Sequence, residues 1–132
     1  SNAYSEATCP KVTVIAGSAC GAVYIAMAGR GANADVTLAW PCATVSPLAP
    51  ATGAMFAWND KLAGSENPVE DRKKLIEEYK NTECTPFKAA AGGFIEDIIQ
   101  PSETRAKVIA NLDMLASKRV SRLPKKHANI QL

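Results

Sequence analysis

Residues 11–24 read Lys-Val-Thr-Val-Ile-Ala-Gly-Ser-Ala-Cys-Gly-Ala-Val-Tyr, an apolar run followed by a stretch of mostly small residues. The run at 11–16 is apolar and β-branched, which predicts a central strand of an α/β sheet, buried on both faces. Gly17 and Gly21 permit the positive φ angles of a sharp turn, and residues 22–27 predict a helix. Because the first N–H groups of a helix have no intrahelical acceptor, this turn offers backbone donors to an anionic oxygen.

The length and composition of the chain indicate one globular domain. It has 132 residues, of which 47% are hydrophobic, enough apolar material for a core of that size. Residues 1–3, Ser-Asn-Ala, are typical of the remnant of a cleaved purification tag, so we assign the native segment to residues 4–132. A net charge of +2 is too small to predict nucleic-acid binding. We find no signal peptide and no apolar run of transmembrane length, and therefore expect a cytoplasmic protein without membrane insertion.

The four cysteines are far apart, at positions 9, 20, 42 and 84. They form no C-x-x-C pair, so the sequence supports neither a zinc site nor a thioredoxin-like motif. We expect free thiols that are buried or half-buried, and no metal bound by this chain.

The remaining elements alternate between extended and helical segments. Extended segments are predicted at 35–40, 43–46 and 94–99, and helices at 51–62, 69–80, 86–91 and 103–117. Asn67-Pro68 predicts a capped start for a surface helix, and Ser102 is the predicted N-cap of the last helix. A sheet of three or four short strands is thin, so we expect part of a larger layered α/β fold, followed by an extended basic tail from Lys118.

Cys20 is the first candidate nucleophile, because residues 17–21 have the glycine spacing of a nucleophile elbow. Ala19 occupies the central position, however, and the only histidine, His127, lies in the basic tail. Without a base, Cys20 is better interpreted as a small residue packed under the turn, and Ser18 lacks a partner in the same way.

Two other groups of side chains are candidate sites. Glu96 and Asp97 are adjacent acids, but neighbouring residues of a strand point to opposite faces, so we expect solvated or paired carboxylates. Trp40 and Trp58 are interpreted as core and interface residues, with the lining of a ligand channel as the alternative.

Four segments resemble a known family: residues 11–15, 39–41, 93–105 and 125–130. The most distinctive are Asp-Ile-Ile-Gln-Pro-Ser-Glu-Thr-Arg at 97–105 and Lys-Lys-His-Ala-Asn-Ile at 125–130. From about residue 10 to the end, the sequence resembles the C-terminal part of the carboxyltransferase (beta) subunit of biotin-dependent acyl-CoA carboxylases and decarboxylases of the propionyl-CoA and methylmalonyl-CoA type.

The resemblance implies a crotonase-type (ClpP/crotonase) fold, of which this chain is the later portion of the second of two related α/β domains. It implies transfer of a carboxyl group between biotin, attached to a carrier protein, and an acyl-CoA. The enolate oxygens of that chemistry are held by backbone N–H pairs across a dimer interface. The implied partners are the remainder of the subunit, the biotin carboxyl carrier protein and further copies in a homo-oligomer.

On the family pattern Tyr-Gly-Gly-Ala-Tyr, the backbone N–H groups of Ala22 and Val23 form the oxyanion hole and Gly21 sets the turn. The pocket on the biotin side is then lined by Cys20, Tyr24 and Ile25. The isolated fragment is expected to be inactive, because half of each composite site lies elsewhere, and to self-associate through an exposed sheet edge.

This sequence departs from the pattern at several positions, which keeps two alternatives open. Cys20 replaces the aromatic residue, Ala22 replaces the second glycine and Val23 replaces the alanine, while residues 41–44, Pro-Cys-Ala-Thr, lack an acid of the family. The first alternative is a non-catalytic assembly or binding module of the same fold with a drifted pocket. The second is an unrelated crotonase-fold hydrolase that uses Cys20.

Overall fold

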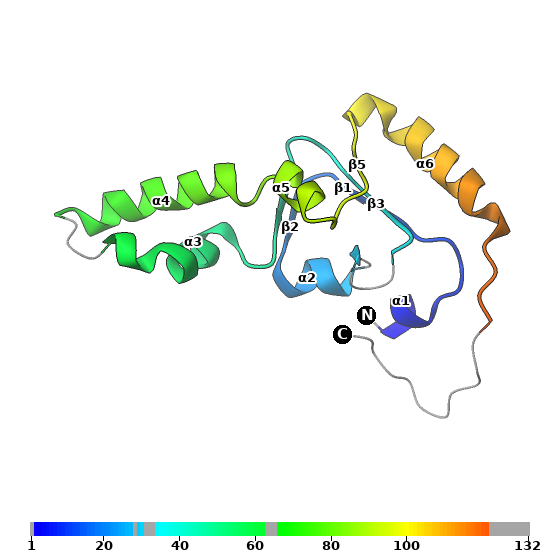
Figure 1. Ribbon diagram of the computed structural model, residues 1–132, viewed down its shortest axis with the longest axis horizontal. Coiled ribbons are helices and arrows are strands. Elements are labelled where there is room, and N and C mark those ends of the chain that lie inside the picture. The colour runs from blue at the N-terminus through cyan, green and yellow to red at the C-terminus, as the bar shows by residue number, and fades with distance from the viewer. Residues whose placement is uncertain (1, 28, 31–33, 63–65, 122–132) are drawn as a thin grey trace.

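The structure is a computed structural model that describes residues 2–27, 29–30, 34–62 and 66–121. Figure 1 shows a block of strands and short helices from which a pair of helices projects. The elements, with 3₁₀ helices labelled η, are α1 (Asn2–Glu6), β1 (Val12–Ile15), β2 (Ser18–Cys20), α2 (Gly21–Ala26), β3 (Val36–Ala39), β4 (Thr44–Ser46), α3 (Pro50–Trp58), η2 (Asn59–Leu62), α4 (Pro68–Thr82), α5 (Pro86–Ala91), β5 (Asp97–Ile98), η3 (Pro101–Glu103), α6 (Thr104–Met114) and η4 (Leu115–Ser117). Asn2 and Ala3, which the sequence assigns to a tag remnant, lie in α1.

All the described strand pairs are parallel. One sheet has the order β1-β3-β5, and a second sheet pairs β2 with β4. All four residues of β3 are buried, whereas Ile15 is the only buried residue of β1. The prediction of a central strand at 11–16 is therefore wrong for the described sheet: β1 lies at its edge, and β3, with a strand on each side, is the buried centre.

The core lies on both faces of β3. One cluster consists of Ile15, Ala39, Ala43, Val45 and Ile95, and the other of Val36, Leu38 and Ile99. Because successive side chains of a strand point to opposite faces, Val36 and Leu38 of β3 belong to one cluster and Ala39 belongs to the other.

The predicted turn between the first strand and the first helix contains a strand. Residues Ser18 to Cys20 form β2, which pairs in register with β4, and the helix begins directly after it at Gly21. Gly21 has a φ of 68°, as predicted, but Gly17 is not in the positive region. The direction change is thus concentrated at one glycine.

The predicted strand at 94–99 is reduced to the two residues of β5. Glu96 explains where the ladder stops: its carboxylate Oε2 accepts the Thr37 N–H at 2.7 Å, while its own N–H donates to the Thr37 carbonyl. A side-chain oxygen thus takes the place of a backbone acceptor beside β3.

The arm in Figure 1 consists of α3, η2 and α4. The predicted helix at 51–62 is α3 continued by η2, and α4 buries none of its residues, as expected for a surface helix. A T-shaped contact between Trp58 of α3 and Tyr79 of α4 holds the two helices of the arm together, with ring centroids 5.2 Å apart. Lys61 Nζ lies 3.8 Å from the centroid of the Trp58 ring. Asn67 precedes α4 as predicted, but its side chain makes no capping bond.

The helical run at 101–117 consists of η3, α6 and η4. Its capping box pairs Gln100 with Glu103, and the Gln100 N–H donates to Glu103 Oε2 at 3.1 Å. The prediction of Ser102 as N-cap is wrong because the 3₁₀ turn begins one residue earlier, at Pro101. Trp40 Nε1 donates to Thr104 Oγ1 at 2.9 Å, which fixes the start of α6 against the sheet.

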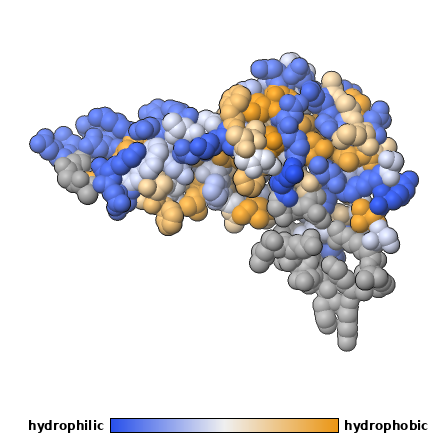
Figure 2. Space-filling view, viewed as in Figure 1, coloured by the Kyte–Doolittle hydropathy of each residue, from blue (hydrophilic) through white to orange (hydrophobic). Residues whose placement is uncertain are grey.

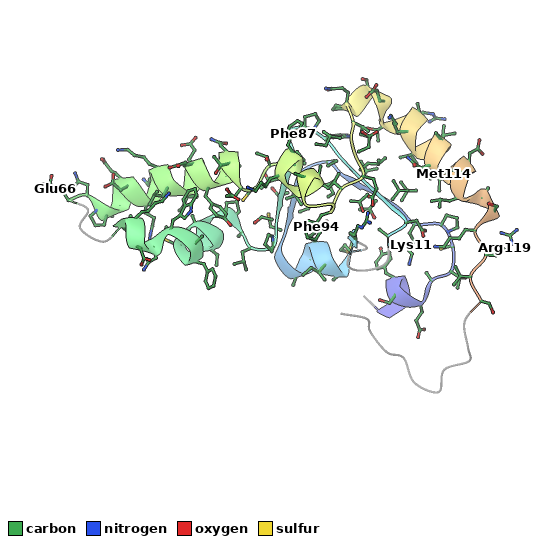
Figure 3. All side chains as sticks on the ribbon, in the orientation of Figure 1. Lys11, Glu66, Phe87, Phe94, Met114 and Arg119 are labelled. Atoms are coloured by element: carbon green, nitrogen blue, oxygen red, sulfur yellow. The ribbon has the colours of Figure 1, made fainter. Side chains whose placement is uncertain are left out.

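Apolar side chains are also exposed at the surface, as Figure 2 shows over the block of strands and short helices. Three of them are labelled in Figure 3: Phe87 of α5, Met114 of α6, and Phe94 in the segment between α5 and β5. No helix in the described ranges is long and apolar enough to cross a membrane. The basic residues Lys125 and Lys126 and the single histidine, His127, lie outside the described residues.

Candidate functional site

A hollow of about 330 Å³ follows the edge of β1 and continues beside β2 and α2. It is lined by residues 13–20 together with Val23, Tyr24 and Met27. Because neighbouring residues of a strand point to opposite faces, a hollow that contacts each of them in turn runs along the strand's edge. A second hollow of about 560 Å³ shares Thr13 and Met27 with the first and extends toward α1.

The helix α2 reaches this hollow through its N-cap residue Cys20 and through Val23 of its first turn. Cys20 occupies the N-cap position with extended backbone and makes no side-chain capping bond, and Gly21 begins the helix. The N–H groups of Gly21, Ala22 and Val23 belong to the first turn, where an α-helix supplies no acceptor. The Val23 side chain is 71% exposed.

The structure brings together part of the predicted site. Cys20, Val23 and Tyr24 line the first hollow, whereas Gly21, Ala22 and Ile25 lie outside its lining. Sequence analysis missed Met27, which lines both hollows. The helical spacing of Val23, Tyr24 and Met27 is the signal that places Met27 on the same side.

The environment of Cys20 does not favour a nucleophile. Burial, and then the neighbouring Cys84 thiol, raise the pKa of Cys20, and a weaker opposing effect comes from a backbone hydrogen bond with Ser46. A reactive cysteine needs a lowered pKa.

The prediction that all four thiols are at least half-buried is wrong. Cys84 is buried and Cys20 is intermediate, but Cys9 and Cys42 are exposed because they lie in connecting segments. All four are free thiols.

Tyr24 has an unusual environment for a polar side chain. Its hydroxyl is buried and finds no hydrogen-bond partner of normal geometry among the described residues. Burial raises the pKa of Tyr24, and the backbone N–H and the charge of Arg30 lie close enough to oppose this rise only in part. The tyrosine packs against the core cluster that contains Ile15 and Ala39.

Glu96 and Asp97 do not form a catalytic pair. Glu96 forms an ion pair with Arg30, and Asp97 accepts from Lys107 Nζ at 2.8 Å. The expectation of solvated or paired carboxylates is confirmed by these two ion pairs, and neither residue lines either hollow. In the described part of the chain, no three His, Cys, Asp or Glu side chains are grouped to hold a metal ion.

The family model described as "Carboxyl transferase domain" matches residues 2–130. The chain belongs to the carboxyl transferase domain family. It is 44% identical over 130 residues to the propionyl-CoA carboxylase carboxyltransferase subunit of Haloferax mediterranei, covering 98% of this chain and 25% of that one. It is 41% identical over 127 residues to the methylmalonyl-CoA carboxyltransferase 12S subunit of Propionibacterium freudenreichii, covering 96% of this chain and 24% of that one.

Solved structures of this family have the same fold. The transcarboxylase 12S crystal structure, with methylmalonyl-coenzyme A and methylmalonic acid bound, matches 98% of this chain and 25% of its own at a TM-score of 0.85 and 40% identity. The beta subunit of P. aeruginosa geranyl-CoA carboxylase matches 97% of this chain and 25% of its own at a TM-score of 0.70 and 20% identity, which supports the fold alone. The predicted family and the partial crotonase-type α/β fold are confirmed. The carboxyl transferase segment spans about a quarter of the length of these relatives.

Proposed function

We propose that the full-length subunit containing this chain transfers a carboxyl group between biotin, carried on a separate protein, and an acyl-CoA. The observation that carries this proposal is the match to acyl-CoA carboxyltransferase subunits across 98% of the chain. When bound, biotin supplies the carboxyl group in exchangeable form. Where the hollow reaches the first turn of α2, its walls include the small side chains of Ser18 and Ala19, which leave room for the biotin ring.

Within this activity, we infer that the backbone N–H groups of Ala22 and Val23 hold an anionic oxygen, with Gly21 setting the turn. Their position in the first turn of α2, next to the hollow, supports this role. Cys20, Tyr24 and Ile25 then act as pocket residues on the biotin side. Only backbone groups are required, so the departures at Cys20, Ala22 and Val23 from the family pattern are compatible with activity.

The experiment is carboxyl exchange by the full-length subunit, measured with labelled methylmalonyl-CoA and a biotinylated carrier protein. We expect exchange with at least one short acyl-CoA. Val23→Pro removes one donor at a position where a helix tolerates proline, and we expect a fall in kcat of at least about a hundredfold. Val23→Ala keeps the N–H and is the matched control, with kcat near the wild-type value. Absence of exchange with every short acyl-CoA tested would contradict the proposal.

The substitutions at the turn favour one other function, a non-catalytic assembly module. Cys20, Ala22 and Val23 are all larger or chemically different from the family residues, and a pocket without selection for turnover accumulates such changes. Normal turnover by the full-length subunit would exclude this function. Binding of the carrier protein without exchange would support it.

The remaining features of the proposed enzyme concern its assembly. We expect a cytoplasmic homo-oligomer that binds the biotin carboxyl carrier protein and requires no metal from this chain. The transcarboxylase 12S structure is a hexamer assembly with substrate binding to a multienzyme core, which supports an oligomer here. Light scattering of the full-length subunit, with and without the carrier, tests the assembly.

A further inference from the structure

Gly29 lies directly against Tyr24. A Cβ atom at Gly29 would lie 2.8 Å from the Tyr24 carbonyl oxygen and 3.0 Å from Cε2 of its ring. Real Cβ atoms do not approach backbone oxygen that closely, so a side chain at position 29 would have to displace Tyr24 or be displaced itself. Gly29 is itself buried.

Tyr24 is also in contact with the core. It packs against the cluster of Ile15, Ala39, Ala43, Val45 and Ile95. Its hydroxyl is buried and makes no hydrogen bond of normal geometry among the described residues; the nearby Arg30 N–H only partly offsets the effect of burial on its pKa. The ring, rather than the hydroxyl, therefore fixes the position of this side chain.

The residue after Gly29 connects the same place to the central strand. Arg30 pairs with Glu96, and Glu96 Oε2 accepts the N–H of Thr37 in β3 at 2.7 Å. Gly29 therefore contacts Tyr24, and the next residue, Arg30, is linked to the sheet through Glu96. Tyr24 is also part of the wall of the first hollow, next to Val23.

We propose that Tyr24, in contact with both the core cluster and Gly29, is the positioning residue that sets α2 beside the first hollow. This inference rests on the proposed function, because the groups that α2 positions are the N–H donors of Ala22 and Val23. Tyr24 follows Val23 in the same turn of α2, so a displaced ring moves those donors. A displacement of about 1 Å at a reacting centre costs on the order of a hundredfold in rate.

The test compares two glycine substitutions in the full-length subunit. Gly29→Ala is expected to lower kcat for carboxyl exchange by about tenfold to a hundredfold, with the KM for acyl-CoA unchanged. Gly53→Ala is the matched control, since its Cβ would lie 2.7 Å from Cε1 of Tyr79 in the arm, away from the hollow. We expect Gly53→Ala to leave kcat unchanged. Tyr24→Leu removes the ring and should lower kcat to a similar extent as Gly29→Ala.

A second readout does not depend on activity. Cys20 lines the hollow, and cleavage after Lys11 and Arg30 gives a peptide of residues 12–30 in which Cys20 is the only cysteine. Its rate of alkylation by iodoacetamide, measured by mass spectrometry of that peptide, reports the position of α2. We expect Cys20 to be alkylated faster in Gly29→Ala and in Tyr24→Leu. The rate should stay at the wild-type value in Gly53→Ala and in Tyr24→Phe, which keeps the aromatic ring.

The two readouts separate the two hypotheses. A wild-type subunit without exchange contradicts the proposed function, and the alkylation rates still decide whether Tyr24 and Gly29 position α2. Unchanged Cys20 alkylation in Gly29→Ala would overturn the positioning role, whatever the effect on kcat. Tyr24→Leu removes the contact between the Tyr24 ring and Gly29 by changing the tyrosine instead of the glycine. If Gly29→Ala does not fold, Tyr24→Leu serves as the test variant in its place.

Discussion

At the scale of single residues, Asp35 connects segments that are distant in sequence. Its Oδ2 accepts the Lys11 N–H at 2.7 Å, and both carboxylate oxygens lie 2.7 Å from Lys118 Nζ, 83 residues away. The side chains of Lys118 and Asp35 are only 16% and 21% exposed. Burial alone would raise the pKa of Asp35, but Lys118 and Lys11 outweigh it and hold the pKa below its usual value.

Asp35→Asn is therefore expected to change the pH dependence of stability. Because the pKa of Asp35 is lower in the folded state, its contribution is present above the unfolded pKa of about 3.9 and is lost as pH falls through the folded value. At neutral pH the variant should lose about 1–3 kcal/mol of unfolding free energy. Urea denaturation over a pH series checks this, and the loss should shrink in acid. A loss that does not vary with pH would contradict it.

Two threonines that differ in their hydrogen bonds allow a paired prediction. The Thr37 hydroxyl is buried without a partner among the described residues, whereas the Thr104 hydroxyl accepts the Trp40 Nε1–H at 2.9 Å. Thr37→Val should leave the unfolding free energy unchanged or raise it by up to about 1 kcal/mol, because it removes an unpaired buried group. Thr104→Val should lower it by about 1–2 kcal/mol. Denaturation of the two variants in parallel gives the comparison, and equal losses would count against this assignment.

At the scale of elements, the junction of β2 and α2 depends on one glycine. Gly21 has a φ of 68°, a conformation that costs other residues roughly 1–2 kcal/mol. Gly21→Ala should lower the unfolding free energy by about that amount. Gly17 lies in open space and is not in the positive region, so Gly17→Ala is the control and should stay within about 0.5 kcal/mol of wild type. Thermal denaturation of both variants distinguishes them, and equal effects would argue against a strained turn at Gly21.

Elements with local signals were predictable from the sequence, and those that depend on distant partners were not. Pro68 and Pro86 mark helix starts that the structure confirms. The edge position of β1 follows from the strand order, which no local pattern encodes. The same holds for β2, whose three residues are extended because β4 lies beside them.

The candidate site was predictable only in part. Cys20, Val23 and Tyr24 lie within one short stretch, so sequence analysis could place them together, and the structure does so. Gly29, in contrast, indicates only a helix break when it is read from the sequence. Its contact with Tyr24, five residues earlier, depends on the backbone conformation at the end of the helix, which the residue types alone do not determine.

At the scale of the whole molecule, apolar surface is exposed at two separate places. Met27 is 58% exposed beside the open edge of β1, and Phe56 of α3 is 86% exposed on the arm. An unprotected, apolar strand edge promotes pairing with other chains. The chain spans about a quarter of its relatives, in which further residues are available to cover such surfaces.

We expect the isolated chain to self-associate through the β1 edge. Sedimentation velocity over a concentration series should show species larger than a monomer. Met27→Lys places a charge beside the edge and should shift the distribution toward monomer. Phe56→Lys alters the arm instead and should leave the distribution unchanged. A strictly monomeric wild-type chain, or an effect confined to Phe56→Lys, would contradict this prediction.

The parallel order β1-β3-β5 also determines how the chain folds. The contacts between Lys11 and Asp35 and between Thr37 and Glu96 span 24 and 59 residues, so large loops must close before the sheet gains any stability. The helical arm lies inside the longer of these loops and requires only local contacts between α3 and α4. We therefore expect the arm to form early, which shortens the effective loop, and the docking of β5 on β3 to be the late and slow step. The residues around Glu96 are accordingly where a folding transition state is expected to be least structured.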